Sequence, residues 1–320
     1  MNGQPAVGTK PPARPRRRYS RDVVRGNIEM YSMFLPVAIL LIIFCYIPIY
    51  GIVVAFQNYA PGSPFVGPNV KWVGLKHFTT FFQSIYFSRL IGNTLVLSIL
   101  NLIFGFWIPI IFALLLNEVR HVRFKKFAQT ASYLPHFISM VVVAGILINF
   151  TTSDGLVNNI IARFNSNYSP QNLRLNASAF PTIYTVTNVW KGFGWGSILY
   201  LSTISSIDPG MYEAARIDGG NRWHQAWYIT LPGLKNIIAI RLIMSVGAIL
   251  AANSELILLI YSPATYETAD VIGTYVYRVG LLQGQFSYTT AIGFFMAVIG
   301  FALTYITNMI SNRITGYGLW

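Results

Sequence analysis

The chain has 320 residues, of which 54% are hydrophobic and only 10% are charged, and its mean hydropathy is +0.50. A soluble domain carries about 25% charged residues, so this composition excludes an ordinary water-facing fold and indicates lipid as the solvent. The net charge of +13 does not indicate nucleic acid as a partner. Most of that charge lies in short segments beside apolar runs, as the positive-inside rule expects, and no base-reading motif accompanies it.

The cysteine and histidine residues of this sequence have neither the number nor the spacing that a disulfide or a metal site requires. Cys45 is the one cysteine, and the four histidines are scattered without the spacing of metal ligands. The sequence also lacks a GxxxxGK[ST] phosphate loop. We therefore expect no catalytic residue, no metal and no cofactor in this chain, and any ATPase that drives it has to be a separate polypeptide.

Residues 1–32 form a basic arm that is rich in proline near its start. The first part of the arm has little apolar surface to bury, so we expect it to be disordered. Three adjacent arginines at 16–18 are compatible with a twin-arginine export signal. The long apolar run that follows, without a small-residue cleavage site, favours a cytoplasmic anchor instead.

Six mainly apolar segments follow the arm, each about 20 residues long, which is the length of a helix that crosses a bilayer. They cover residues 33–56, 90–116, 133–150, 181–205, 236–260 and 289–310. The third segment is short, and the fourth is the least apolar because it contains Lys191 and several Gly, Ser and Thr residues. We predict an all-α integral membrane protein with six transmembrane helices.

The loops between these segments alternate in positive charge. Basic residues of the arm, of the loops after the second and fourth segments and of the tail are Lys10, Arg14, Arg16, Arg17, Arg18, Arg21, Arg25, Arg120, Arg123, Lys125, Lys126, Arg216, Arg222, Lys235 and Arg313. The opposite loops hold Lys71, Lys76, Arg163, Arg174 and Arg278. The excess places both termini in the cytoplasm. We predict a cytoplasmic arm over 1–32, a membrane domain over 33–311 and a cytoplasmic tail over 312–320.

Residues 206–233 form a polar loop between the fourth and fifth segments. Asp208, followed by proline, predicts a helix start. The glycine pair at 219–220 predicts the end of that helix, since glycine takes the left-handed cap conformation without steric cost. Asn221 can then cap a second helix. Two short helices joined by a sharp turn suit force transmission to a partner, although a plain connector between two spans has the same pattern.

The residue order in this loop resembles the EAA loop of bacterial ABC importer permeases, in which a glycine follows Glu-Ala-Ala and Ile-x-Leu-Pro closes the motif. The matching residues are Glu213, Ala214, Ala215, Asp218, Gly219, Ile229, Leu231 and Pro232. The resemblance implies that the loop docks into an ATPase subunit, with Glu213 pairing with a basic group or helix cap there. Ala226 and Asn236 depart from the aromatic and the second proline that many carbohydrate-type permeases have.

Other segments resemble carbohydrate-uptake permeases of the LplB-like branch, which is linked to oligosaccharides and to polysaccharide fragments, including acidic ones such as aldouronates or alginate. They are VGLKHF at 73–78 with Gly92-Asn93-Thr94, YLPHFIS at 133–139, residues 266–278 and the closing Gly318-Leu319-Trp320. The resemblance implies a multi-pass protein of the bacterial inner membrane that pairs with a second homologous permease. It also implies two ATPase subunits, which bind ATP and Mg, and an external solute-binding protein that delivers the sugar.

Two ionisable residues lie inside the predicted spans, Lys191 in the fourth and Glu255 in the fifth. Such groups are costly in a membrane and usually face a cavity or each other, so we expect both to line the translocation pathway, singly or as a pair. The alternative is an ion pair or a snorkelling lysine that fixes helix packing. Lys191 suits an anionic sugar, whereas pairing with Glu255 would cancel that preference, so a neutral and an acidic substrate both stay open.

Aromatic and amide side chains near these two residues are further candidates for the pathway. Amphipathic rings stack on the C–H faces of sugars and tolerate a wet cavity, although helix or lipid packing explains most membrane aromatics. Amides can hydrogen-bond sugar hydroxyls or a neighbouring helix. The candidates are Trp190, Trp195, Tyr200 and Asn253.

The interpretation that combines these observations is a non-catalytic permease subunit of an ATP-driven importer for oligosaccharides. An ion-coupled secondary transporter would need paired intramembrane carboxylates or inverted repeats, and Glu255 stands alone. A membrane enzyme would need an acidic or histidine cluster at a membrane face. An ABC permease for a non-sugar solute would differ chiefly in the specificity of its binding protein.

Overall fold

The computed structural model describes residues 21–320, with side chains from residue 25 onward. The first part of the basic arm, for which the sequence predicts disorder, lies outside the described residues. Within the described range the regular elements are helices, and one isolated antiparallel pairing joins Gln57 to Trp72. The chain divides into two units, Met1–Ile52 and Val53–Trp320.

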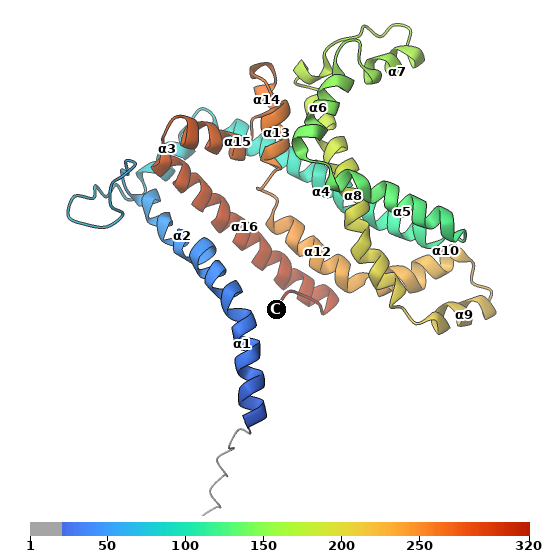
Figure 1. The fold of residues 1–320 in the computed structure, drawn as a ribbon. Coiled ribbons are helices and arrows are strands. Elements are labelled where there is room, and N and C mark those ends of the chain that lie inside the picture. Colours follow the sequence, from blue (N-terminus) through green and yellow to red (C-terminus); the bar gives the residue numbers. More distant parts are fainter. Residues whose placement is uncertain (1–20) are drawn as a thin grey trace, which may run out of the picture. The chain divides into compact units, whose positions relative to one another are not determined.

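The first unit is one long helix with irregular turns. It runs through α1 (Arg21–Leu41), a π-helical turn over Ile42–Tyr46, α2 (Ile47–Ile49) and a 3₁₀ segment that starts at Tyr50, and it is drawn in blue in Figure 1. The apolar stretch Arg25–Phe56 is long enough to cross a membrane. The helix begins before residue 33, where the sequence predicted the span to start, and most of its large apolar side chains are exposed.

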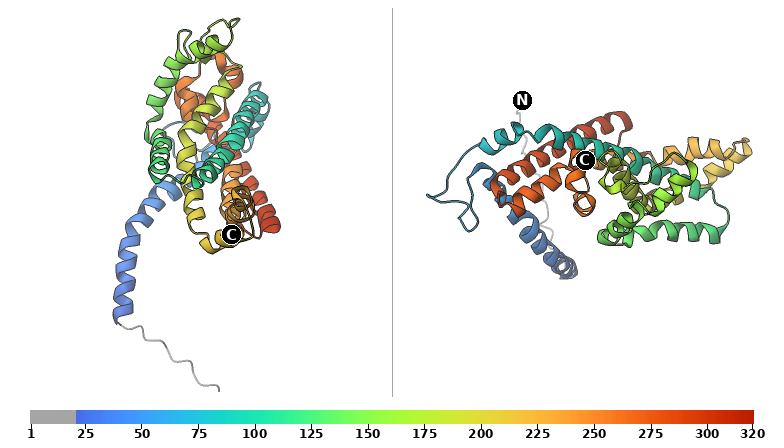
Figure 2. Two further views of the ribbon diagram at one scale, coloured as in Figure 1. Left: turned by 90° about the vertical axis from the view of Figure 1, so that its right-hand side faces the viewer. Right: turned by 90° about the horizontal axis from the view of Figure 1, so that it is seen from above.

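The helices α4 (Phe87–Asn117) and α8 (Phe180–Ser205) are the most extensively packed pair in the second unit. They approach closely at Gly196, where an added Cβ would lie 3.3 Å from the side chain of Pro109. A second pair, α12 (Lys235–Gly247) and α16 (Phe286–Thr315), packs side by side (Figure 1, Figure 2). These helices meet at Gly247, where an added Cβ would clash with Thr304.

Three buried apolar clusters hold the second unit together, and α4 contributes to each of them. The first joins α4 to α6 (Met140–Thr151), α8, α13 (Ser254–Ile260) and α14 (Tyr266–Ala269). The second joins α4 to α3 (Lys76–Phe82), α15 (Ile272–Val276), the π-helical Tyr277–Leu282 and α16. The third joins α4 to α8 and Leu234. The fold therefore depends on α4 as its central helix.

The third predicted span, 133–150, is wrong as one continuous helix. The structure ends α5 (Val122–Phe137) before Ile138 and starts α6 at Met140, with the Ser139 hydroxyl accepting a hydrogen bond from the Val142 amide. Residues 133–137 therefore belong to α5, which packs on α8. The apolar stretch that is long enough to cross a membrane here is Met140–Phe164, which includes α7 (Leu156–Phe164).

The fifth predicted span, 236–260, is also interrupted. The helix α12 ends at Gly247, residues 248–253 leave the helical path, and α13 begins at Ser254. Asn253 caps α13 by accepting a hydrogen bond from the Leu256 amide. The backbone N–H of Asn253 donates to the hydroxyl of Tyr184 on α8 at 2.8 Å. The break is therefore held by side chains and is not a frayed end.

Membrane-crossing length and composition fit four helices in the described part of the chain: Arg25–Phe56, Phe87–Asn117, Met140–Phe164 and Phe286–Thr315. A bent pair, Arg222–Gly233 with Lys235–Gly247, makes a fifth if it counts as one span. The helix α8 coincides with the predicted fourth span but is too polar to pass the same test. The all-helical membrane class is thus confirmed, with four or five apolar spans in the described residues.

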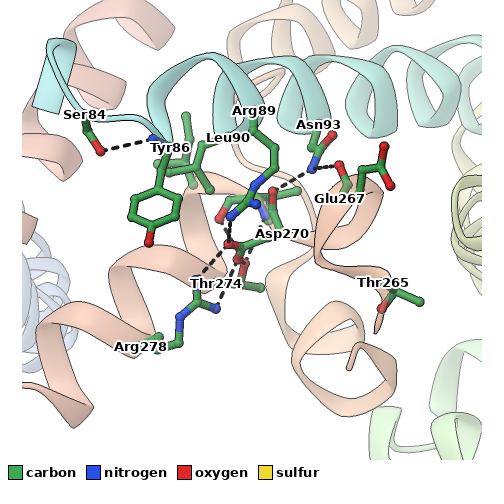
Figure 3. A network of polar contacts seen from close by, with 12 residues as sticks. Ser84, Tyr86, Arg89, Leu90, Asn93, Thr265, Glu267, Asp270, Thr274 and Arg278 are labelled. Carbon is green, nitrogen blue, oxygen red and sulfur yellow. Dashed lines mark hydrogen bonds and ion pairs between the residues drawn. The ribbon is translucent and has the colours of Figure 1, made fainter. Parts of the chain in front are cut away.

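A buried carboxylate fastens α14, α15 and the following π-helical turn to the start of α4 (Figure 3). Asp270 is fully buried and accepts two hydrogen bonds from Arg278, at 3.1 and 2.7 Å, and one from the Thr274 hydroxyl at 2.8 Å. Arg89 of α4 lies 3.5 Å from the same carboxylate. Partial burial by itself lowers the pKa of the Arg278 guanidinium, but the hydrogen bonds and charge of Asp270 raise it above its ordinary value.

Replacing Asp270 with asparagine should destabilise the protein by about 3–5 kcal/mol, because two guanidinium groups lose their buried counter-charge. The measurement is the thermal unfolding midpoint of the purified protein in detergent. Asp154→Asn, on the exposed turn before α7, is the matched control and should leave the midpoint unchanged. Equal midpoints for the two variants would contradict the fastening role of Asp270.

Candidate functional site

The polar loop after α8 folds as its sequence predicts. The helix α9 (Pro209–Ile217) starts at Asp208, whose carboxylate accepts a hydrogen bond from the Gly210 amide at 2.9 Å. It ends at Gly219, which has a φ of +80°. The helix α10 (Arg222–Gln225) is capped by Asn221, which accepts from the His224 amide at 2.9 Å. The predicted helix, sharp turn and second helix are confirmed.

The end of the loop is buried and bonded to Tyr212 of α9, while other residues of α9 are exposed. A π-helical turn over Ala226–Thr230 and α11 (Leu231–Gly233) carry the chain from α10 into α12, with a bend of 60° before Lys235. Ile229 and Thr230 are buried, and the Thr230 hydroxyl hydrogen-bonds to that of Tyr212 at 3.0 Å. Glu213 and Ala214, in contrast, are exposed on α9.

Large apolar side chains stand exposed on this loop. Ile217 is 87% exposed and Trp223 is 79% exposed. The others are Met211, Trp227 and Tyr228. Exposed apolar patches of this kind mark surfaces that bind other proteins.

A hollow of about 860 Å³ lies between the loop and the C-terminal end of α4. Charged residues line it, namely Glu118, Arg120, Glu213, Arg216 and Arg222. Arg222 crosses the hollow, pairing with the Glu118 carboxylate at 3.5 Å and donating to its carbonyl at 3.3 Å. The loop and the end of α4 therefore form one charged surface that surrounds a hollow.

A second cavity, of about 370 Å³, lies between α4, α8, α12 and the break at 248–253. This volume is in the range of small-ligand sites, about 300–1,000 Å³. Its polar lining residues are Ser98, Asn101, Asn188, Arg241, Ser245 and Asn253, and no acidic residue lines it. We call it the α8 cavity.

Lys191 has a structural role. Its ammonium donates hydrogen bonds to the carbonyl oxygens of Pro135, His136 and Ile138, at 3.2, 2.9 and 2.5 Å. A positive charge at a helix C-terminus is stabilised by the helix dipole, and here it also gives a charged donor to carbonyls at the break after α5. The ion pairs of residues 25–320 do not join Lys191 to Glu255, which is exposed in the first turn of α13.

The predicted pathway residues separate into two groups in the structure. Tyr200 and Asn253 line the α8 cavity. Trp195 stacks on the ring of His136 with centroids 4.5 Å apart, and Trp190 lines two hollows on α8 that are otherwise almost entirely apolar. Neither tryptophan, nor Lys191, nor Glu255 lines the α8 cavity.

Several polar residues of the α8 cavity were missed by the sequence reasoning. Asn188 accepts a hydrogen bond from the Asn253 side chain at 2.9 Å, and Arg241 interacts with the hydroxyl of Tyr200. Arg241 had a visible signal, since it is an arginine between apolar residues in a predicted span. Asn101, Asn188 and Ser245 had none, because single small polar residues are common in membrane helices.

Residues 105–316 match the family of binding-protein-dependent transport system inner membrane components. The chain belongs to this family. It is therefore a multi-pass inner-membrane subunit of a transport system and not an enzyme, and the family membership predicted from the loop is confirmed.

Two curated relatives from Bacillus subtilis (strain 168) match along nearly the whole chain. The polygalacturonan/rhamnogalacturonan transport system permease protein YteP is 42% identical, over 91% of this chain and 90% of its own length. The protein LplB is 36% identical, over 91% of each chain.

Two solved structures are also similar. One is a bacterial ABC transporter involved in the import of the acidic polysaccharide alginate, with a TM-score of 0.82 and 42% identity over 92% of this chain and 98% of that chain. The other is a bacterial alginate ABC transporter in complex with a periplasmic protein that carries an alginate pentasaccharide. It has a TM-score of 0.83 and 42% identity over 93% of this chain and 99% of that chain.

Replacing Lys191 with methionine should lower stability, because methionine keeps the apolar stem but leaves three carbonyls without their charged donor. Hydrogen bonds that involve a charged group contribute about 1.5–3 kcal/mol each, so we expect the thermal midpoint to fall by several degrees. The thermal midpoint of the Lys191→Arg variant, which keeps the charge, should fall less. Unchanged stability of the methionine variant, measured in detergent, would contradict the capping role.

Proposed function

We propose that this chain is one of two permease subunits in an ATP-driven importer that carries oligosaccharides, with fragments of acidic polysaccharides as the preferred cargo. The observation that carries the proposal is the full-length similarity, at 42% identity, both to a permease named for polygalacturonan and rhamnogalacturonan and to an importer of the acidic polysaccharide alginate. The similarity covers 91% of this chain for the permease and 92% for the importer.

The complex that we propose contains a second homologous permease, two ATPase subunits that bind ATP and Mg, and an external solute-binding protein. The similar transporter with a bound periplasmic protein supports the last of these partners. The exposed apolar side chains of the polar loop and of the first helix support contacts with other proteins or lipid. This chain binds no ATP in the proposal.

Six spans with both termini in the cytoplasm remain our proposed topology. The helix α8, with 26 residues, is long enough to cross the bilayer, and several of its polar side chains bond to neighbouring backbone, which lowers the cost of burying them in lipid. The bent helix pair supplies another span. The arm over 1–32, the membrane domain over 33–311 and the tail over 312–320 keep their proposed bounds.

The loop 206–233 is the proposed contact with an ATPase subunit. Glu213, Ala214 and Ala215 lie on α9, and Asp218 and Gly219 form the turn after it. Ile229, Leu231 and Pro232 lie where the loop joins α12. Because the Tyr212–Thr230 hydrogen bond and the buried Ile229 tie the two ends together, a displacement of α9 by the ATPase is transmitted to α12.

The α8 cavity is the proposed section of the substrate pathway. It has amides and hydroxyls for sugar hydroxyl groups, and Tyr200, Phe106 and Phe193 for apolar sugar faces. Rotation of α12 moves one wall of this cavity. In the proposal, a displacement of the loop 206–233 therefore changes the side of the membrane to which the cavity opens. Substrate contact also stays a prediction for four residues that do not line this cavity, namely Lys191, Trp190, Trp195 and Glu255.

Replacing Gly219 with valine should uncouple transport. A β-branched residue is strained at a φ of +80°, so the turn between α9 and α10 has to change. We expect a loss of roughly tenfold or more in the ATPase stimulation by oligosaccharide-loaded binding protein, from a misplaced docking contact worth about 1.4 kcal/mol or more. The measurement uses the reconstituted complex with neutral and acidic oligosaccharides.

The matched control is Gly62→Val, because Gly62 has a φ of +87° and lies in the loop before α3, outside the coupling loop. It carries the same kind of backbone strain and should leave stimulation intact. Assembly of both variants is checked by size-exclusion chromatography. If an assembled Gly219→Val complex shows the same ATPase stimulation as the wild-type complex, the loop is only a connector between two spans.

A further inference from the structure

We propose that Arg241 recognises the carboxylate of an acidic sugar unit inside the α8 cavity. The proposal rests on the proposed transport function and adds the residue that gives the pathway its preference for charge. Arg241 lies in the middle of α12 and lines the cavity together with residues of α4 and α8.

The charge of Arg241 has no counter-charge within the described residues. The ion pairs of residues 25–320 join Arg25 to Glu29, Arg222 to Glu118, and Arg89 and Arg278 to Asp270. None includes Arg241, and no acidic residue lines the cavity. An ionised group at such a position in a membrane protein is costly unless a partner arrives, and an anionic substrate is such a partner.

The guanidinium also has unused donor capacity. Its Nε atom is buried and has no hydrogen-bond partner. The neighbouring Tyr200 hydroxyl engages only part of a group that carries five N–H donors. Arginine presents these donors as a planar fork that matches the two oxygens of a carboxylate. The free donors of Arg241 therefore fit a uronate better than a neutral hydroxymethyl group.

Lys191, the cation of α8, is already engaged. Lys191 donates to three carbonyl oxygens at the end of α5 and does not line the cavity. The cation available to substrate in the α8 cavity is therefore Arg241, whereas Lys191 hydrogen-bonds to backbone carbonyls.

The rest of the lining fits a sugar ring. The Ser98 hydroxyl is buried and has no hydrogen-bond partner, and Asn101, Asn188 and Asn253 bring amides to the same space. The volume of about 370 Å³ is near the lower end of small-ligand sites, about 300–1,000 Å³. The cavity therefore holds a short part of an oligosaccharide at a time, so that successive carboxylates can meet Arg241.

The test compares two ligands that differ only in charge: an alginate pentasaccharide and the same pentasaccharide with its carboxyl groups reduced to hydroxymethyl. Direct binding to the assembled, detergent-solubilised complex is measured by equilibrium dialysis, and uptake of the acidic ligand with its binding protein is measured in proteoliposomes. The protein variants are wild type, Arg241→Gln, Arg241→Lys and Arg163→Gln. Arg163 is an exposed arginine on α7 and is the charge-matched control.

We expect the wild-type complex to bind the acidic ligand roughly ten- to hundredfold more tightly than the reduced one, as for loss of one charge-assisted hydrogen-bonded pair. Arg241→Gln should abolish that preference, Arg241→Lys should keep part of it, and Arg163→Gln should keep all of it. A wild-type complex that binds both ligands equally overturns the proposal even if the variants fail to assemble. An Arg241→Gln complex that keeps the preference overturns it as well.

The two proposals fail in different ways. A wild-type complex that imports no oligosaccharide from its loaded binding protein contradicts the transport function. A wild-type complex that imports the acidic ligand, together with an Arg241→Gln complex that imports it equally well, contradicts only the role of Arg241.

Discussion

A chain that leaves the helical path inside a bilayer has to satisfy its freed backbone groups within the protein, and in this structure α8 supplies the partners. Lys191 donates to carbonyls at the end of α5, and Tyr184 accepts the Asn253 amide at the break before α13. Asn188 then holds the Asn253 side chain. Three polar residues of α8, Tyr184, Asn188 and Lys191, are thus the ones that stabilise the breaks in its neighbours.

The break at 248–253 lies at one end of α12 and lines the α8 cavity, while the loop 206–233 lies at the other end of α12. The break ends α12 at Gly247, against α16, and its residues complete one wall of the α8 cavity. The other end of α12 continues, through a bend, into the loop that we propose to dock on the ATPase. Arg241 lies between these two ends. In the coupling that we propose, a displacement of the loop reaches the cavity through this one short helix.

Local signals in the sequence were sufficient for the loop, whose caps at Asp208 and Asn221 and turn at Gly219 depend on near neighbours. The apolar runs also located α4, α8 and α16, each of which covers one predicted span. The sequence did not reveal the break at 248–253, because a hydrophobicity pattern does not register the bonds that Tyr184 and Asn188 make to Asn253 from far along the chain. Arg89 and Asp270 lie even farther apart in the sequence, so their pairing could not be predicted either.

The question of a neutral or an acidic substrate was open in the sequence because Lys191 and Glu255 could have paired. In the structure the two residues do not pair, since Lys191 donates to backbone carbonyls and Glu255 is exposed on α13. Neither residue sets the charge of the α8 cavity. That charge comes from Arg241, in a lining without carboxylates. A cavity of one sign with a partly unpartnered guanidinium attracts anions, so our proposal of an acidic sugar has an electrostatic argument that does not depend on the relatives.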